Sequence, residues 1–209
     1  MGKIQAVIFD LGGVILDIDY KRTESAFLDL GVGNFGELFS QLRQDRLFDD
    51  FETGRIDPEN FRERLRSIAG LPITDKQIDR AWNAILIGLP KQNVDFLFAL
   101  REKNYRLFLL SNTNAIHEQA FRKMISDLYG EFIFDRIFEK MYLSHHVHLR
   151  KPDVAVYNLV LLENDLNPAS TLFVDDSFQN IEGAKKAGLH SFWLEKGKNI
   201  HDLSEIFTG

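Results

Sequence analysis

The sequence contains no cysteine among its 209 residues. Disulfide frameworks and thiolate metal sites are therefore excluded, and a reducing compartment is expected. No apolar run approaches the length of a membrane span. The N-terminus, MGKIQAVIFD, has too short an apolar stretch for a signal peptide. These absences predict a cytoplasmic protein with no membrane partner.

The chain also lacks an excess of basic residues, because its formal net charge is −6 at pH 7. Nucleic-acid binding usually requires a basic footprint, so no nucleic-acid partner is expected. Hydrophobic residues make up 44% of the chain and include 18 phenylalanines. This is enough for a sizeable core, in one domain or one domain with a modest insertion.

Short apolar runs alternate with helical patterns along the chain. The runs are AVIFD (6–10), RLFLLSN (106–112), TLFVDD (171–176) and the weaker HSFWL (190–194). The helical patterns cover 91–103, 114–127, 153–163 and 177–187. Near-continuous apolar runs are typical of parallel strands that are buried on both faces. The alternation predicts an α/β fold with a Rossmann-like parallel sheet.

The stretch between the first two runs is too long for one crossover and predicts an inserted α-helical cap at 18–88. Its expected helices cover 21–30, 34–48, 58–69 and 75–87. Asp57 before Pro58 is a helix-start signal, and Thr74 with Gln77 forms a capping-box pattern. The core is accordingly expected to comprise residues 1–17 and 89–209.

Polar residues follow three of the buried runs. They are Asp10, then Ser111 with Asn112, then Asp175 with Asp176. Ligands of open parallel sheets bind beyond the carboxyl ends of the strands, so these groups are expected to converge. Clustered carboxylates require positive charge, which Mg²⁺ and Lys151 could supply. Such a cradle suits a phosphoryl group, and one carboxylate would be free to attack phosphorus.

The order of these residues resembles that of a known family. The motifs FDLGGV (9–14), LLSNTN (109–114), RKPD (150–153) and FVDDSFQNIEGA (173–184) match in sequence. Together they resemble the haloacid dehalogenase-like hydrolase superfamily, in the branch with a helical cap after the first strand. Each motif is weak alone, but the four cover the core from end to end. The cap matches only in its position and helical character.

The resemblance implies a role for each matching residue. Asp10 would be the nucleophile, while Ser111, Asn112 and Lys151 would bind phosphoryl oxygens. Lys151 would also steady the nucleophile. The metal ligands would be Asp10, the Gly12 carbonyl, Asp175 and Asp176, with Asp176 the more direct of the two acids. Asn180 matches an asparagine that often follows these acids. The plainer alternatives are a turn acid at Asp10, helix caps at Ser111, Asn112 and Asn180, and a surface lysine at Lys151.

Gly12 departs from the pattern, because many phosphatases of the superfamily have a second aspartate at this position for acid–base catalysis. General acid–base catalysis typically increases the reaction rate by about 10²–10⁴-fold. Asp17, Asp19 or the histidines of SHHVHLRK (144–151) could supply the proton instead. Those histidines are otherwise interpreted as polar residues of an exposed loop, with a separate metal site as a further alternative. Gly12 and Gly13 also suit a sharp turn.

The sequence thus predicts a Mg²⁺-dependent phosphatase that acts on a small phosphate ester, such as a sugar phosphate, through an aspartyl-phosphate. The alternatives are a non-catalytic phosphate-binding protein and a dehalogenase. Arg55, in the segment FDDFETGRID (48–57), is a candidate for a second anionic group on the substrate and could equally be a surface arginine. A monomer is expected, with a dimer through the exposed cap as the alternative.

Overall fold

A parallel five-stranded sheet forms the centre of the computed structural model, which describes residues 3–33, 36 and 46–207. The strand order is β5-β4-β1-β6-β7. The strands are β1 (Ala6–Phe9), β4 (Arg106–Ser111), β5 (Lys140–Leu143), β6 (Thr171–Asp175) and β7 (His190–Trp193). The α/β fold with a parallel sheet is therefore confirmed. The four predicted runs form β1, β4, β6 and β7.

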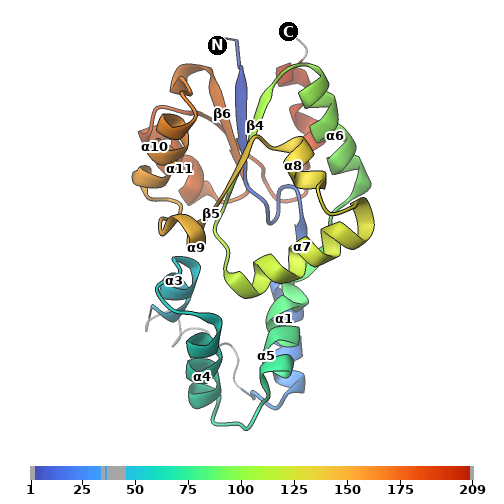
Figure 1. The fold of residues 1–209 in the computed structure, drawn as a ribbon, viewed down its shortest axis with the longest axis vertical. Helices are drawn as coiled ribbons and strands as arrows, with labels where there is room; N and C mark the ends of the chain where they lie inside the picture. The colour runs from blue at the N-terminus through green and yellow to red at the C-terminus, as the bar shows by residue number, and fades with distance from the viewer. Residues whose placement is uncertain (1–2, 34–35, 37–45, 208–209) are drawn as a thin grey trace.

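The sheet is covered by helices on both faces, as Figure 1 shows. The helices of the sheet region are α6 (Lys91–Glu102), α7 (Ala115–Tyr129), α8 (Ile133–Ile137), α9 (Ser144–Val147), α10 (Val154–Glu163), η2 (Pro168–Ser170), α11 (Phe178–Lys186) and η3 (Ile200–Phe207). Val7 and Phe9 of β1 pack in a cluster with α6, α7 and α8. Ala6 and Ile8 belong to a second cluster with α10 and α11. Because successive side chains of a strand point to opposite faces of the sheet, β1 contributes to both hydrophobic clusters.

The remaining helices form a separate group, here called the helical region. It consists of α1 (Tyr20–Asp29), α3 (Leu47–Glu52), α4 (Pro58–Ala69), α5 (Asp75–Trp82) and η1 (Asn83–Ile85). It has a hydrophobic cluster of its own, which includes Phe27, Phe51, Phe61 and Trp82 and reaches the sheet region at Ile116. In Figure 1 this region lies below the sheet, on the side toward which β1 runs.

The predicted helix starts of the helical region are confirmed. The Asp57 side chain accepts a hydrogen bond from the Asn60 N–H, and Pro58 begins α4. Thr74 and Gln77 form a reciprocal capping box at the start of α5. Most of the predicted helix at 34–48 lies outside the described residues.

The predicted helix at 75–87 is wrong beyond Trp82. After η1 the chain forms β3 (Leu86–Gly88), which pairs antiparallel with β2 (Asp17–Ile18). The two segments that join the helical region to the sheet region are therefore hydrogen-bonded to each other. Pairing with β2 therefore outweighs the local helical pattern of residues 86–88.

Two elements of the sheet region differ from the expectation from sequence. Strand β5, KMYL, was not predicted, because it is a short edge strand without a continuous apolar run. The segment SHHV forms α9, and His145 is only 8% exposed. The interpretation of these histidines as residues of an exposed loop is therefore wrong for the helical conformation and for His145, whereas His146 and His148 are exposed as expected. No helix among the described residues is long and apolar enough to cross a membrane.

Candidate active site

The carboxyl ends of three neighbouring strands bring the predicted residues to one cavity. Asp10 follows β1, Ser111 ends β4, and Asp176 follows β6. The three line a cavity of about 690 Å³, together with Asn112 and Lys151. The Asp10 N–H donates to the Val174 carbonyl oxygen at 2.9 Å, which continues the β1–β6 pairing up to the site. The sheet thus fixes the position of the Asp10 side chain.

Lys151 lies between two carboxylates in the interior. Its Nζ is 2.7 Å from Asp10 Oδ1 and 2.6 Å from Asp175 Oδ2. The Lys151 side chain is 1% exposed and that of Asp175 is fully buried. Burial alone would lower the lysine pKa, but the two carboxylates raise it above its usual value. The ammonium therefore stays charged and provides the positive charge that the two acids need.

One lysine does not neutralise the site. Burial raises the pKa of Asp10 to about 7, against the opposing effect of Lys151 and with a further rise from Asp175. Burial, followed by the charge of Asp175, also raises the pKa of Asp176. When ionised, three carboxylates and one ammonium carry a net charge of −2. One oxygen from each of Asp10, Asp175 and Asp176 lies within 4.8 Å of the others. This donor set suits a hard divalent cation.

Asp175 is the most restrained acid of the group. Its Oδ1 accepts hydrogen bonds from the Ser177 N–H at 2.8 Å and from Asn180 Nδ2 at 3.0 Å. Asn180 Nδ2 also lies 3.1 Å from Oδ2. Asn180 therefore contacts an acid of the site as well as lining the cavity. Asp175 is held in place, whereas Asp176 is more exposed and has more freedom to contact a ligand.

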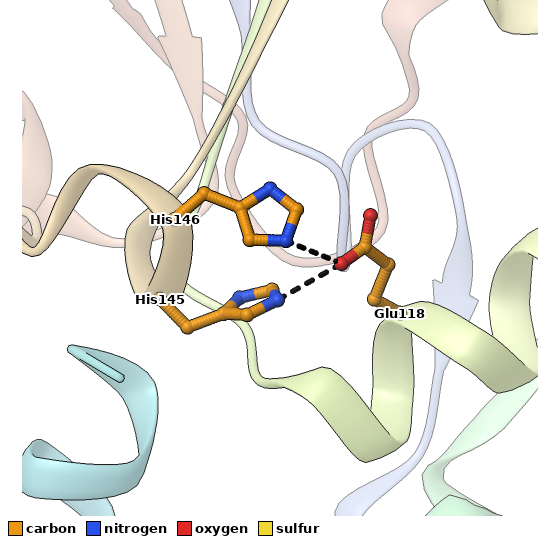
Figure 2. A group of neighbouring side chains, drawn as sticks. All are labelled: Glu118, His145 and His146. Carbon is orange, nitrogen blue, oxygen red and sulfur yellow. Dashed lines mark hydrogen bonds and ion pairs between the residues drawn. The ribbon is translucent and has the colours of Figure 1, made fainter. Parts of the chain in front are cut away.

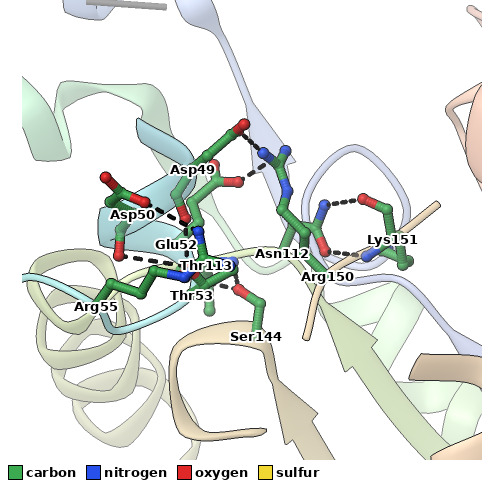
Figure 3. A network of polar contacts seen from close by, with 10 residues as sticks. All are labelled: Asp49, Asp50, Glu52, Thr53, Arg55, Asn112, Thr113, Ser144, Arg150 and Lys151. Atoms are coloured by element: carbon green, nitrogen blue, oxygen red, sulfur yellow. Dashed lines mark hydrogen bonds and ion pairs between the residues drawn. The ribbon is translucent and has the colours of Figure 1, made fainter. Parts of the chain in front are cut away.

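The side chain of Asn112 pairs with the main chain of Lys151. Asn112 Oδ1 accepts from the Lys151 N–H, and Asn112 Nδ2 donates to the Lys151 carbonyl oxygen, both at 2.9 Å (Figure 3). Ser144 makes a similar pair of hydrogen bonds with the main chain of Thr113, also at 2.9 Å. These contacts tie the segment that carries Lys151 to the end of β4. No pattern in the sequence indicates this role of the Asn112 side chain.

The two glycines after Leu11 differ in their constraints. Gly13 has φ of +78°, and an added Cβ would lie 2.3 Å from Asp176 Oδ2. Gly13 therefore meets both expectations for a turn glycine, positive φ and close approach. Gly12 lines the cavity, and an added Cβ would lie 3.3 Å from Ile18 Cδ1, the end of a flexible side chain. Space for a side chain at position 12 thus depends on a small movement of Ile18.

The helical region supplies the opposite wall of the cavity. Tyr20, Phe48 and Trp82 line it, and the rings of Phe48 and Trp82 stack with a centroid distance of 5.4 Å. His117 of α7 stacks on the same Trp82 at 5.2 Å. These aromatic groups line the same cavity as the acidic edge of the sheet. Tyr20, Trp82 and His117 belong to none of the motifs that the sequence analysis identified.

An arginine other than Arg55 joins the two regions. Arg150, which lines the cavity, forms ion pairs with Asp49 and Glu52 of α3, the latter at 2.9 Å (Figure 3). Arg55 pairs with Asp50 at 3.1 Å and is not among the residues that line the cavity. The structure therefore does not place Arg55 where a second anionic group would bind. The sequence signal that could have identified Arg150 as a residue of the site is its position next to Lys151 in the RKPD motif.

The alternative proton donors lie away from the cavity lining. Asp19 caps α1 by accepting from the Lys21 N–H, and Asp17 lies in β2. His145 and His146 contact Glu118, and His148 Nδ1 lies 2.8 Å from the Thr53 carbonyl oxygen. None of the five lines the cavity. His117 is the histidine that does so.

The fold and the site define an α/β protein with an acidic, lysine-containing centre at the carboxyl edge of a parallel sheet. The model of the haloacid dehalogenase-like hydrolase family matches residues 4–188. The chain belongs to this family, and the family predicted from the four motifs is confirmed.

Relatives of known structure or activity cover almost the whole chain. D-ribitol-5-phosphate phosphatase of Bacteroides thetaiotaomicron is 30% identical over 194 residues, which are 93% of each chain. A haloacid dehalogenase-family enzyme from the same organism, crystallised with magnesium and inorganic phosphate, superposes with a TM-score of 0.85 at 35% identity. That alignment covers 96% of this chain and 98% of the other. A predicted hydrolase of this family from Porphyromonas gingivalis gives a TM-score of 0.88 at 29% identity, with full coverage of both chains.

Proposed function

We propose that the protein is a Mg²⁺-dependent phosphatase that hydrolyses a small sugar phosphate or sugar-alcohol phosphate. The observation that carries this proposal is the contact of Lys151 with both Asp10 and Asp175, beside Asp176 at the same edge. The relative that is a D-ribitol-5-phosphate phosphatase and the related structure with magnesium and phosphate support it. Dehalogenation needs no cation, so an acidic site that suits a divalent cation favours phosphoryl transfer.

Asp10 would act as the nucleophile. One of its oxygens attacks phosphorus, the bond to the ester oxygen breaks, and the departing alkoxide takes a proton from solvent water to leave as the alcohol. Water then attacks the aspartyl-phosphate, which releases inorganic phosphate and restores the carboxylate. Bound Mg²⁺ would neutralise charge on the phosphoryl oxygens, held by Asp10, the Gly12 carbonyl, Asp175 and Asp176.

Lys151 and Ser111 would bind phosphoryl oxygens, and Lys151 also holds Asp10 through the 2.7 Å contact. Because the Asn112 side chain is paired with the Lys151 main chain, its main contribution would be to position the lysine. Asn180 would position Asp175 through its hydrogen bonds to that carboxylate. Asn112 and Asn180 are therefore positioning residues, which would keep Lys151 and Asp175 in place during the reaction.

We further propose that residues 18–88 act as a cap over a core of residues 1–17 and 89–209. The separate hydrophobic cluster and the pairing of β2 with β3 support this division. The Arg150 ion pairs with Asp49 and Glu52 would hold the cap against the core. A closed cap would exclude water from the phosphoryl group and select the substrate.

The lining of the cavity supports a polyhydroxylated substrate. Glu24 offers a carboxylate that accepts hydrogen bonds from hydroxyl groups. Phe48 and Trp82 offer an apolar wall for the carbon chain. A cavity of about 690 Å³ is within the usual range for small-molecule sites.

The test is turnover of a panel of phosphate monoesters with and without Mg²⁺. The panel contains an aryl phosphate, primary and anomeric sugar phosphates, D-ribitol 5-phosphate and nucleotides. Metal-dependent turnover of a sugar or polyol phosphate that is lost in Asp10→Asn supports the proposal. Asp17→Asn is the matched control, because Asp17 is an exposed acid of the neighbouring strand β2. Absence of turnover on every ester, with Mg²⁺ still bound, would favour the non-catalytic alternative.

A further inference from the structure

A second cluster of potential metal ligands lies outside the cavity. Glu118 of α7 faces His145 and His146 of α9, and both imidazole Nε2 atoms lie 2.9 Å from Glu118 Oε2 (Figure 2). One ligand atom from each residue lies within 4.8 Å of the others. None of the three lines the active-site cavity. Two adjacent histidines on one turn thus converge on a single carboxylate oxygen.

We propose that Glu118, His145 and His146 bind a divalent transition-metal ion of the zinc class. Two imidazole nitrogens and one carboxylate oxygen suit Zn²⁺, Co²⁺ or Ni²⁺ and do not suit Mg²⁺, which prefers oxygen ligands. Tetrahedral metal–ligand bonds of about 2.0–2.1 Å place neighbouring ligand atoms about 3.3–3.4 Å apart. The observed 2.9 Å separations of the two nitrogens from Oε2 are shorter by about 0.4–0.5 Å, which a small side-chain movement on metal binding would provide.

The carboxylate is already oriented for this role. Arg122 Nε donates to Glu118 Oε1 at 2.7 Å, which leaves Oε2 directed at the histidines. Hydrogen bonds to the second oxygen of a ligating carboxylate are typical of outer-shell groups that orient metal ligands. Glu118 and Arg122 are one helical turn apart in α7, so this orientation is local and does not depend on the active site.

The backbone that carries the histidines is also fixed. Ser144 begins α9 and bonds the main chain of Thr113 at the end of β4. His145 is buried, with a side-chain exposure of 6%, whereas His146 is 56% exposed. A buried ligand and a carboxylate would therefore form the inner side of the site. The exposed imidazole gives an ion a route from solvent.

A bound ion would cross-link helices α7 and α9. Helix α9 leads directly into the segment that carries Arg150 and Lys151, and His148 contacts Thr53 of the helical region. A metal at the cluster would join α9 to α7 and limit movement of this connection. Binding to the native state alone raises the melting temperature, which is a readout independent of turnover.

The experiment is a titration of the chelator-treated protein with Co²⁺ at saturating Mg²⁺, followed by the visible absorption of Co²⁺. We expect one Co²⁺ per chain and an increase in Tm with Zn²⁺. His146→Ala and Glu118→Gln should weaken binding by at least about 100-fold. His146→Ala is expected to fold, because the side chain is exposed. His190→Ala, outside the cluster, is the matched control and should bind Co²⁺ normally.

Asp176→Asn separates this site from the acidic site, and it should leave the Co²⁺ spectrum unchanged. The proposal is overturned if the wild type shows no stoichiometric Co²⁺ site, or if His146→Ala binds Co²⁺ as tightly as the wild type. Either result would mean that the histidines only hydrogen-bond to Glu118. Loss of the signal in Asp176→Asn would instead assign it to the acidic site.

Discussion

Lys151 Nζ lies 2.6 Å from Asp175 Oδ2, and the side chains of both residues are buried. The same ammonium lies 2.7 Å from Asp10 Oδ1. This lysine therefore offsets the repulsion between two buried acids while it holds the proposed nucleophile. Stability and activity depend on the same side chain, and this relationship leads to the first prediction.

Lys151→Met should lower both stability and turnover. Removing one partner of a buried ion pair typically costs about 3–5 kcal/mol, because the remaining charge is unpaired. Misplacement of the Asp10 side chain should lower kcat by at least about 10²-fold. Urea denaturation and kinetics at pH 7 measure the two effects. Lys140→Met is the control, since Lys140 is half-exposed in an ion pair with Glu163 and its loss should change stability little. Equal stability of the two variants would contradict the prediction.

Gly13→Ala should weaken Mg²⁺ binding, because the added Cβ would lie 2.3 Å from Asp176 Oδ2. The positive φ adds backbone strain of about 1–2 kcal/mol. Gly197→Ala is the matched control, since Gly197 also has positive φ, at +90°, and a Cβ there would meet nothing within 4 Å. Both variants should lose similar stability, but only Gly13→Ala should show a raised Mg²⁺ requirement. Isothermal titration with Mg²⁺ measures the difference, and equal affinities would refute a contact with Asp176.

Gly12→Asp should accelerate the hydrolysis of esters with poor leaving groups. The new carboxyl would stand where related phosphatases have their acid–base residue, and the Cβ would meet the Ile18 side chain, 3.3 Å from Cδ1 and 3.6 Å from Cγ2. The ratio of kcat/KM for an alkyl phosphate to that for an aryl phosphate should rise by about 10²-fold or more. Gly12→Asn has nearly the same shape without the acid and should leave the ratio unchanged. A rise in both variants would point to a steric effect.

His117 should make stability depend on pH below neutrality. Its Nδ1 faces the Asn114 amide nitrogen at 3.1 Å, while its Nε2 faces the Trp82 carbonyl oxygen at 3.2 Å. The Asn114 amide is oriented by the His117 N–H, which donates to Asn114 Oδ1. Nδ1 therefore accepts a hydrogen bond and Nε2 donates one, which describes a neutral imidazole. Burial lowers the pKa of His117 to about 4.

Because the folded state binds a proton less readily than the unfolded state, stability falls as pH drops from about 6.5 toward 4. The loss from this group should reach about 3 kcal/mol near pH 4. Urea denaturation between pH 7.5 and 4.5 should show that His117→Gln is less stable than the wild type at neutral pH and that the difference shrinks with acid. A constant difference across this range would contradict the neutral, buried imidazole.

Four of the five strands of the sheet, the family and the set of acidic residues could be predicted from the sequence. Asp10 and Asp175 come directly after or at the end of continuous apolar runs, and parallel strands bring their carboxyl ends to one edge. Helix caps at Asp57 and Thr74 were also readable, because capping depends on neighbouring residues alone. Local pattern was sufficient for each of these features.

Features that depend on contacts between distant segments are evident only in the tertiary structure. The pairing of β3 with β2 replaced the predicted helix beyond Trp82. The Arg150 contacts with Asp49 and Glu52 join residues about 100 positions apart, and the Glu118 contacts with His145 and His146 join α7 to α9. A sequence pattern records spacing within an element, whereas these contacts depend on how the elements pack. The same packing buries Lys151 between Asp10 and Asp175.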